Sequence, residues 1–71
     1  MLTLGERIRL ERKRYGMTQK ELADRSHISK TAMNDLEQGR TRDPSLSVAT
    51  RIARALGLSL DHLVQEEDSH V

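Results

Sequence analysis

The sequence of 71 residues contains no cysteine, phenylalanine or tryptophan, and Tyr15 is its only aromatic residue. Without cysteine, the chain has no disulfide framework and no thiolate metal site, which favours a reducing cytoplasm. Without large aromatic side chains, the core must be built from Leu, Ile, Ala and Met. A domain of this size gains only ~3–5 kcal/mol from such a core. The chain therefore has no room for a deep, water-excluding pocket, and we expect no enzymatic activity.

Long apolar runs are also missing. No run approaches the roughly 18 residues that a membrane-spanning helix needs, and the first residues lack the apolar stretch of a signal peptide. The three histidines, His27, His62 and His70, are too scattered in the sequence for a metal site. We therefore expect a single intracellular binding domain that does not associate with a membrane and binds no metal, cofactor or small-molecule ligand.

The net charge of +1 hides a gradient along the chain. Residues 1–42 contain ten Lys or Arg against six Asp or Glu, a balance of +4. Residues 43–71 contain two Arg against five Asp or Glu, a balance of −3. This asymmetry points the first part toward an anionic partner, although a solvated mixture of charges explains it equally well.

Helix signals recur along the chain, whereas strand signals are scattered, so we expect an all-α fold. Thr3 with Glu6 and Thr18 with Glu21 form capping-box patterns at the starts of helices. Five helices are predicted, over residues 4–14, from 18 to 25 or 26, from 29 to before Gly39, over 46–56, and from 59 to 64. The expected buried residues recur at helical spacing: Leu4, Ile8 and either Leu10 or Tyr15; Leu22, Ala23, Ala32, Met33 and Leu36; Leu46, Ala49, Ile52, Ala53 and Leu56.

The segment QKELADRSHISKTAMNDLEQ, residues 19–38, contains two short helices separated by a turn at 26–28. Ala23 is small enough for the two helices to approach each other, and Ile28 is expected to fill the turn. The face of the second helix opposite Met33 and Leu36 then presents four polar residues: Lys30, Thr31, Asn34 and Asp35. An exposed helix of this kind fits the major groove of DNA; an ordinary solvated helix face is the alternative.

From residue 4 to about residue 64, the chain resembles the Cro/CI-type, or XRE-like, helix-turn-helix regulators of phages and bacteria. The resemblance depends on four linked motifs: GMTQKELA, ISKTAMNDLEQG, the PSL that follows, and IARALGLSLDHL. It implies a compact five-helix domain like that of lambda repressor over residues 1–64. Its helix-turn-helix spans about 19–38, with a recognition helix at about 29–38. Residues 65–71 remain as an acidic tail that we expect to be disordered.

The resemblance implies roles for individual residues. Lys30, Thr31, Asn34 and Asp35 match positions that face base edges. Positions near DNA phosphates are matched by Gln19, which also braces the recognition helix, and by Ser29, Arg40 and Arg42. On the basic first helix, Arg9 and Arg14 are further candidates for phosphate contacts. Arg12 and Glu37 match a partly buried salt bridge that joins the first and third helices.

Two residues depart from the family pattern, and Asp35 matches a base-facing position with a charge that DNA repels. His27 stands where glycine is usual and must accept a positive φ or shift the turn. Ser26 stands where an apolar residue is common. Asp35 would repel phosphate and can accept a hydrogen bond only from cytosine N4 or, less generally, from an adenine amino group. It could instead pair with Lys30 or with a nearby arginine and orient that cation.

The predicted function is sequence-specific binding of double-stranded DNA by a small transcriptional regulator, a repressor, encoded by a bacterium or a phage. One recognition helix covers only a few base pairs, so we expect a homodimer on a pseudo-palindromic operator with half-sites about 34 Å apart. Leu58 and Val64 are assigned to the dimer interface, whereas Leu60 and Leu63 are expected to pack inward. The alternatives are a restriction–modification controller, an antitoxin, or a protein-interaction module that binds a toxin or a polymerase subunit.

Overall fold

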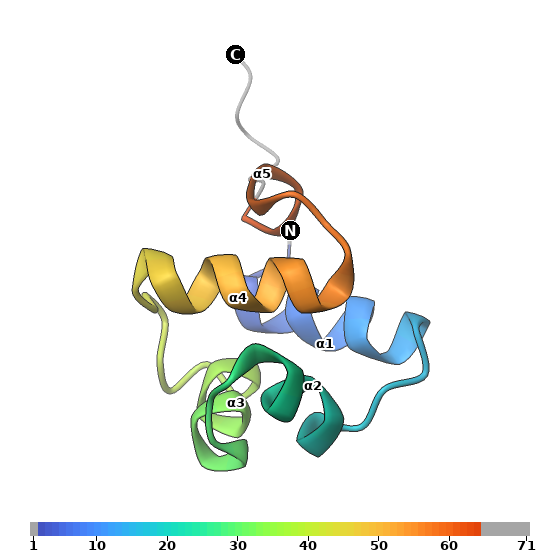
Figure 1. Cartoon of the computed structure of the whole chain (residues 1–71). Coiled ribbons are helices and arrows are strands. Elements are labelled where there is room, and N and C mark those ends of the chain that lie inside the picture. Colours follow the sequence, from blue (N-terminus) through green and yellow to red (C-terminus); the bar gives the residue numbers. More distant parts are fainter. Residues whose placement is uncertain (1, 65–71) are drawn as a thin grey trace.

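The computed structural model describes residues 2–64, so the acidic tail predicted over 65–71 lies outside the described residues. The described part is all-helical, as predicted, and contains no strand. Its five helices are α1 (Leu4–Arg14), α2 (Gln19–Ser26), α3 (Lys30–Glu37), α4 (Leu46–Leu56) and α5 (Leu60–Leu63). In Figure 1, α4 crosses the middle of the molecule, with α5 above it and the α2–α3 pair below it.

A threonine or serine directly precedes each helix as its N-cap, and its hydroxyl accepts a hydrogen bond from a backbone N–H of the first turn. These residues are Thr3, Thr18, Ser29, Ser45 and Ser59. This hydroxyl satisfies a donor that the helix itself leaves without a partner. The two capping boxes predicted at the starts of α1 and α2 are present. Because these signals are local in sequence, the predicted helix ranges agree closely with the structure.

The core consists of apolar residues from all five helices: Ile8, Leu22, Ala23, Met33, Leu36, Ile52, Ala53, Leu56 and Leu63. Neither Leu10 nor Tyr15 is buried, although one of the two is expected to be, and the expected burial of Ala32 and Leu46 is also wrong. Leu10 and Tyr15 are 50% and 54% exposed, because α1 turns Gly5, Ile8 and Glu11 inward instead. Ala32 lies on the outer face of α3, and Leu46 is 70% exposed because it begins α4 beyond the edge of the core.

The third helix is held on its inner side by two others. It packs against α1 and α2, while α2 also packs against α4, and α5 packs against α1 and α4. The approach of α1 is very close, since a Cβ atom at Gly5 would overlap the carbonyl oxygen of Leu36. Among residues 2–64, no other helix covers the opposite side of α3, so its outer side chains face solvent (Figure 1).

Candidate nucleic-acid interface

The turn between α2 and α3 contains a strained residue. His27 has a φ of 60° and a ψ of 40°, the left-handed conformation that glycine adopts most readily. The predicted positive φ at this position is therefore present. Ile28 follows as a partly buried residue packed against the core, and Ser29 caps α3. The turn thus keeps the geometry of the motif without glycine.

Two features of this turn involve residues that come together only in the folded chain. Ser26 is fully buried, and its hydroxyl has no hydrogen-bond partner among the described residues. The Ser26 carbonyl accepts a hydrogen bond of 3.0 Å from Nε of Arg51 in α4. The sequence pattern does not indicate a role for Arg51, since its partner lies 25 residues earlier in the chain. The bond ties α4 to the C-terminal end of α2.

The outer surface of α3 brings together the four residues expected to face base edges. Lys30 and Thr31 are exposed, and Asn34 and Asp35 are partly buried. Because side chains four residues apart share one face of a helix, these residues form two adjacent rows on that face. Met33 and Leu36, which are buried, anchor the helix from its other side.

Gln19, at the start of α2, braces this surface. Its Nε2 donates to Oδ1 of Asn34 and to Oε1 of Glu37, each over 3.2 Å. The bond to Asn34 fixes which way the carboxamide of Asn34 points and leaves its NH₂ group as a donor. One side chain of α2 therefore contacts both the outer face and the inner end of α3.

Arg12 of α1 forms a bidentate ion pair with Glu37. Nε and Nη2 donate to the two carboxylate oxygens over 2.7 and 2.9 Å, and Nη1 donates to the carbonyl of Met17 over 2.9 Å. The side chains of Arg12 and Glu37 are only 11% and 3% exposed. The hydrogen bonds that Arg12 donates to the Glu37 carboxylate raise the pKa of Arg12 above its ordinary value, which keeps the guanidinium charged. Arg12 thus joins α1 to α3.

Asp35 pairs with an arginine rather than with Lys30. Nε of Arg40 donates to Oδ1 of Asp35 over 3.0 Å. The backbone N–H groups of Arg40 and Thr41 also donate to the carbonyl of Asp35, over 2.9 and 3.2 Å. The segment after α3 therefore folds back over the end of the helix, and the charge of Asp35 is compensated.

The other residues expected near phosphates are exposed. The hydroxyl of Ser29 accepts from the N–H of Ala32 and can still donate its own proton. Arg42 lies in the segment between α3 and α4. Arg9 and Arg14 lie on α1, where Nη1 of Arg14 is 3.5 Å from Oε1 of Glu11.

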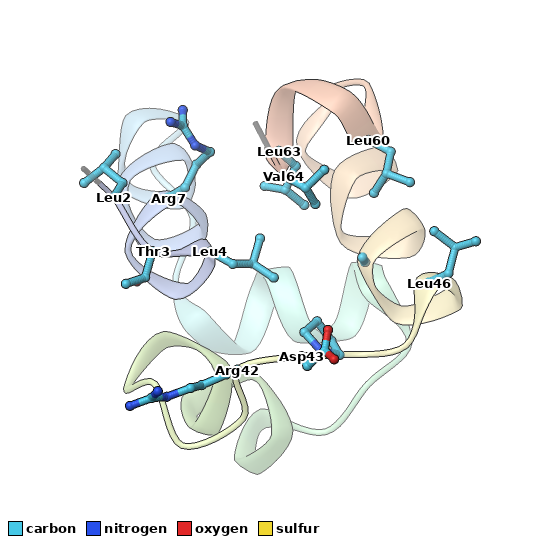
Figure 2. A pocket seen from close by; sticks show the side chains of 12 residues that line it. Leu2, Thr3, Leu4, Arg7, Arg42, Asp43, Leu46, Leu60, Leu63 and Val64 are labelled. Atoms are coloured by element: carbon cyan, nitrogen blue, oxygen red, sulfur yellow. The ribbon is translucent and has the colours of Figure 1, made fainter. Parts of the chain in front are cut away.

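An apolar groove lies away from α3, between the starts of α1 and α4 and the short α5. Three of the large apolar residues that are 40% or more exposed line it: Leu2, Leu46 and Val64. Figure 2 shows Leu4, Leu60, Leu63 and Val64 around the same opening, with Arg42 and Asp43 at its lower edge. Val64, assigned to an interface, is thus in the groove. Leu58 does not line the groove and packs partly against the core.

Within residues 2–64, no helix has the length and apolar character needed to cross a membrane. The same residues contain no group of three or more His, Asp or Glu arranged to hold a metal ion.

A family model described as helix-turn-helix matches residues 8–63. The chain is 38% identical over 66 residues to the immunity repressor protein of Bacillus phage phi105, and the match covers 93% of this chain and 45% of that protein. It is 52% identical over 50 residues to an uncharacterized HTH-type transcriptional regulator of Methanothermobacter thermautotrophicus, with 70% and 71% covered.

The crystal structure of the P22 c2 repressor protein in complex with a synthetic operator superposes with a TM-score of 0.83 at 29% identity, covering 92% of this chain and 97% of that one. The chain spans about half the length of the phi105 repressor that it matches. From the family match and the geometry of α2 and α3, this chain belongs to the helix-turn-helix family.

Proposed function

We propose that this chain binds double-stranded DNA in a sequence-specific manner and acts as a transcriptional repressor. The observation that carries the proposal is the outer face of α3, which presents short polar side chains while α1 and α2 hold its inner side rigidly. A helix presented in this way enters the major groove of DNA. Similar proteins support this function, since one is an immunity repressor and another was crystallised with an operator.

The exposed residues of α3 supply different kinds of base contact. Lys30 suits the O6 and N7 acceptors of guanine, and the methyl group of Thr31 suits the methyl group of thymine. Asn34 can donate to adenine N7 through the NH₂ group that Gln19 leaves available.

Because the carboxamide NH₂ of Gln19 donates to Asn34 and Glu37, Gln19 contacts a phosphate through its backbone N–H in the first turn of α2. Ser29 and Arg42 contact phosphates through their side chains, with Arg9 and Arg14 adding contacts from α1. These contacts supply most of the affinity and no sequence information. A protein with this function works on the nucleoid, in the cytoplasm.

We further propose that the active form is a homodimer on a pseudo-palindromic site. The apolar groove supports self-association. Leu46 at the start of α4 and Val64 just after α5 both line it and are exposed, and no apolar residue of the described chain covers them. Its edge carries both signs of charge, Arg7 and Arg42 with Asp43. A two-fold interface can pair such charges across the symmetry axis. Leu58 contributes at most the part of its side chain that the core leaves uncovered.

The test is selection of bound sequences from a random duplex pool, followed by affinity measurements across a range of salt concentrations. We expect a palindromic motif and an affinity that falls steeply as salt rises. Lys30→Ala should weaken binding to the selected site about tenfold. Arg54→Ala removes one exposed positive charge from the last turn of α4 and should change binding much less.

Weak binding without an enriched motif, even at low salt, would contradict the proposed function and favour a protein partner instead. Equal losses in Lys30→Ala and Arg54→Ala would show that only net charge matters and that α3 does not read bases.

A further inference from the structure

We infer that Arg40 reads a guanine base and that Asp35 holds its guanidinium group in position for this contact. The inference deepens the proposed DNA-binding function and depends on it. It replaces the expectation that Arg40 contacts a phosphate, and of the two alternatives for Asp35 it takes pairing with an arginine over direct contact with a base.

The geometry places Arg40 on the base-facing side of α3 although it lies outside the helix. Two backbone N–H groups, from Arg40 and Thr41, bind the carbonyl of Asp35. The side chain of Arg40 then binds the carboxylate of the same residue through Nε, over 3.0 Å. Main chain and side chain are therefore both anchored to Asp35, which shares its row on the helix with Thr31.

The chemistry of the pair suits a base better than a phosphate. With Nε occupied by Asp35, the two Nη groups of Arg40 remain to donate in parallel, the arrangement that binds O6 and N7 of guanine. A phosphate close to this guanidinium would also lie close to the carboxylate of Asp35, which repels it. A guanine edge presents neutral acceptors, so the carboxylate imposes no such repulsion.

The ion pair between Arg40 and Asp35 contributes little to the stability of the free protein. The side chains of Arg40 and Asp35 are 60% and 35% exposed, and exposed ion pairs contribute little to folding stability because water screens them. In a groove from which water is displaced, the same pair fixes the plane of the guanidinium. Substitutions here should therefore change DNA recognition without changing the unfolding midpoint, which separates this role from a structural one.

The experiment uses the duplex selected by the whole chain and the same duplex with 7-deazaguanine in place of each guanine in turn. This analogue lacks the N7 acceptor and keeps Watson–Crick pairing. For the unmodified protein, the position read by Arg40 should lose about tenfold in affinity, in addition to any guanine contacted by Lys30. Arg40→Ala should bind the unmodified duplex and the duplex with 7-deazaguanine at that position with equal affinity. Asp35→Asn should lose most of the difference in affinity between these two duplexes. Arg42→Ala is the matched control and should keep the full difference.

Two results would overturn the inference while leaving DNA binding established. The first is a uniform loss across all duplexes in Arg40→Ala, with the 7-deazaguanine effect intact and the salt dependence reduced by about one charge; Arg40 would then contact a phosphate. The second is a selected site without guanine in either half. Failure of the unmodified protein to select any site would instead contradict the proposed function itself.

Discussion

Gly5 in α1 lies directly against the carbonyl group of Leu36 in α3, and a Cβ atom at residue 5 would overlap that oxygen. Alanine normally favours a helix over glycine by about 1 kcal/mol. Here the overlap with a backbone atom should outweigh that gain. We expect Gly5→Ala to lower the free energy of unfolding by about 1–3 kcal/mol, as measured by urea titration. Lys13→Ala, at an exposed position of α1, is the control; a more stable Gly5→Ala variant would contradict the close approach.

The ion pair between Arg12 and Glu37 should be structural. Arg12→Met would leave the Glu37 carboxylate buried without its main partner, at a cost of about 3 kcal/mol in unfolding free energy. The double variant Arg12→Met/Glu37→Leu removes the buried charge as well and should recover much of that loss. Urea unfolding of both variants measures the effect. If Arg12→Met kept its stability but bound DNA more weakly per folded molecule, Arg12 would be a phosphate contact.

The helices and the motif could be predicted because their signals are local. Threonine or serine at each helix start and glycine at three ends fix the limits within a few neighbouring residues. The rotation of α1 about its axis could not be predicted, because the sequence suggested that either Leu10 or Tyr15 turns inward, whereas the charged Glu11 does so in the structure. The close contact with α3 buries Gly5, and Glu11 is buried beside α5, where its Oε2 lies 3.6 Å from Nε2 of His62.

The same limit applies to the candidate interface. The pattern singled out Gln19, Asn34 and Asp35 as individual positions, but their partners depend on how the chain folds back. The bond from Arg40 to Asp35 and the bond from Arg51 to Ser26 join different segments of the chain. The sequence allowed Asp35 to pair with Lys30 or with a nearby arginine without choosing between them, and no spacing rule indicates the bond from Arg51 to Ser26.

The left-handed conformation of His27 should cost stability. A residue with a Cβ atom is disfavoured there by about 1 kcal/mol relative to glycine, so His27→Gly should stabilise the domain by a similar amount. Thermal unfolding followed by circular dichroism measures the change. His27→Ala keeps the Cβ atom and should show no such gain. Equal stabilisation by both substitutions would mean that the imidazole, and not the backbone, is the source of the strain.

The capping box of α2 should make stability depend on acid pH. The backbone N–H of Thr18 donates to the Glu21 carboxylate over 2.8 Å, and this bond lowers the pKa of Glu21 below its ordinary value of 4.5. The folded state thus favours the charged form of Glu21. The contribution of this hydrogen bond to folding stability is therefore present above pH 4.5 and is lost as the pH falls through the lowered folded pKa. Glu21→Gln should be less stable at pH 6, and the difference should shrink on acidification. A difference that stays constant from pH 6 to pH 3 would exclude this linkage.

The exposed leucines offer a matched test of the apolar groove. Leu46 lines the groove and Leu10, which is 50% exposed on α1, does not. Leu46→Glu places a charge where a second copy would bury an apolar side chain, so self-association should weaken at least tenfold, about 1.4 kcal/mol. A glutamate in the first turn of α4 is favourable for the helix, and the monomer should stay folded. Leu10→Glu adds the same charge outside the groove and should leave the dimer intact. Sedimentation equilibrium measures both, and equal weakening by the two variants would place the dimer contact elsewhere on the surface.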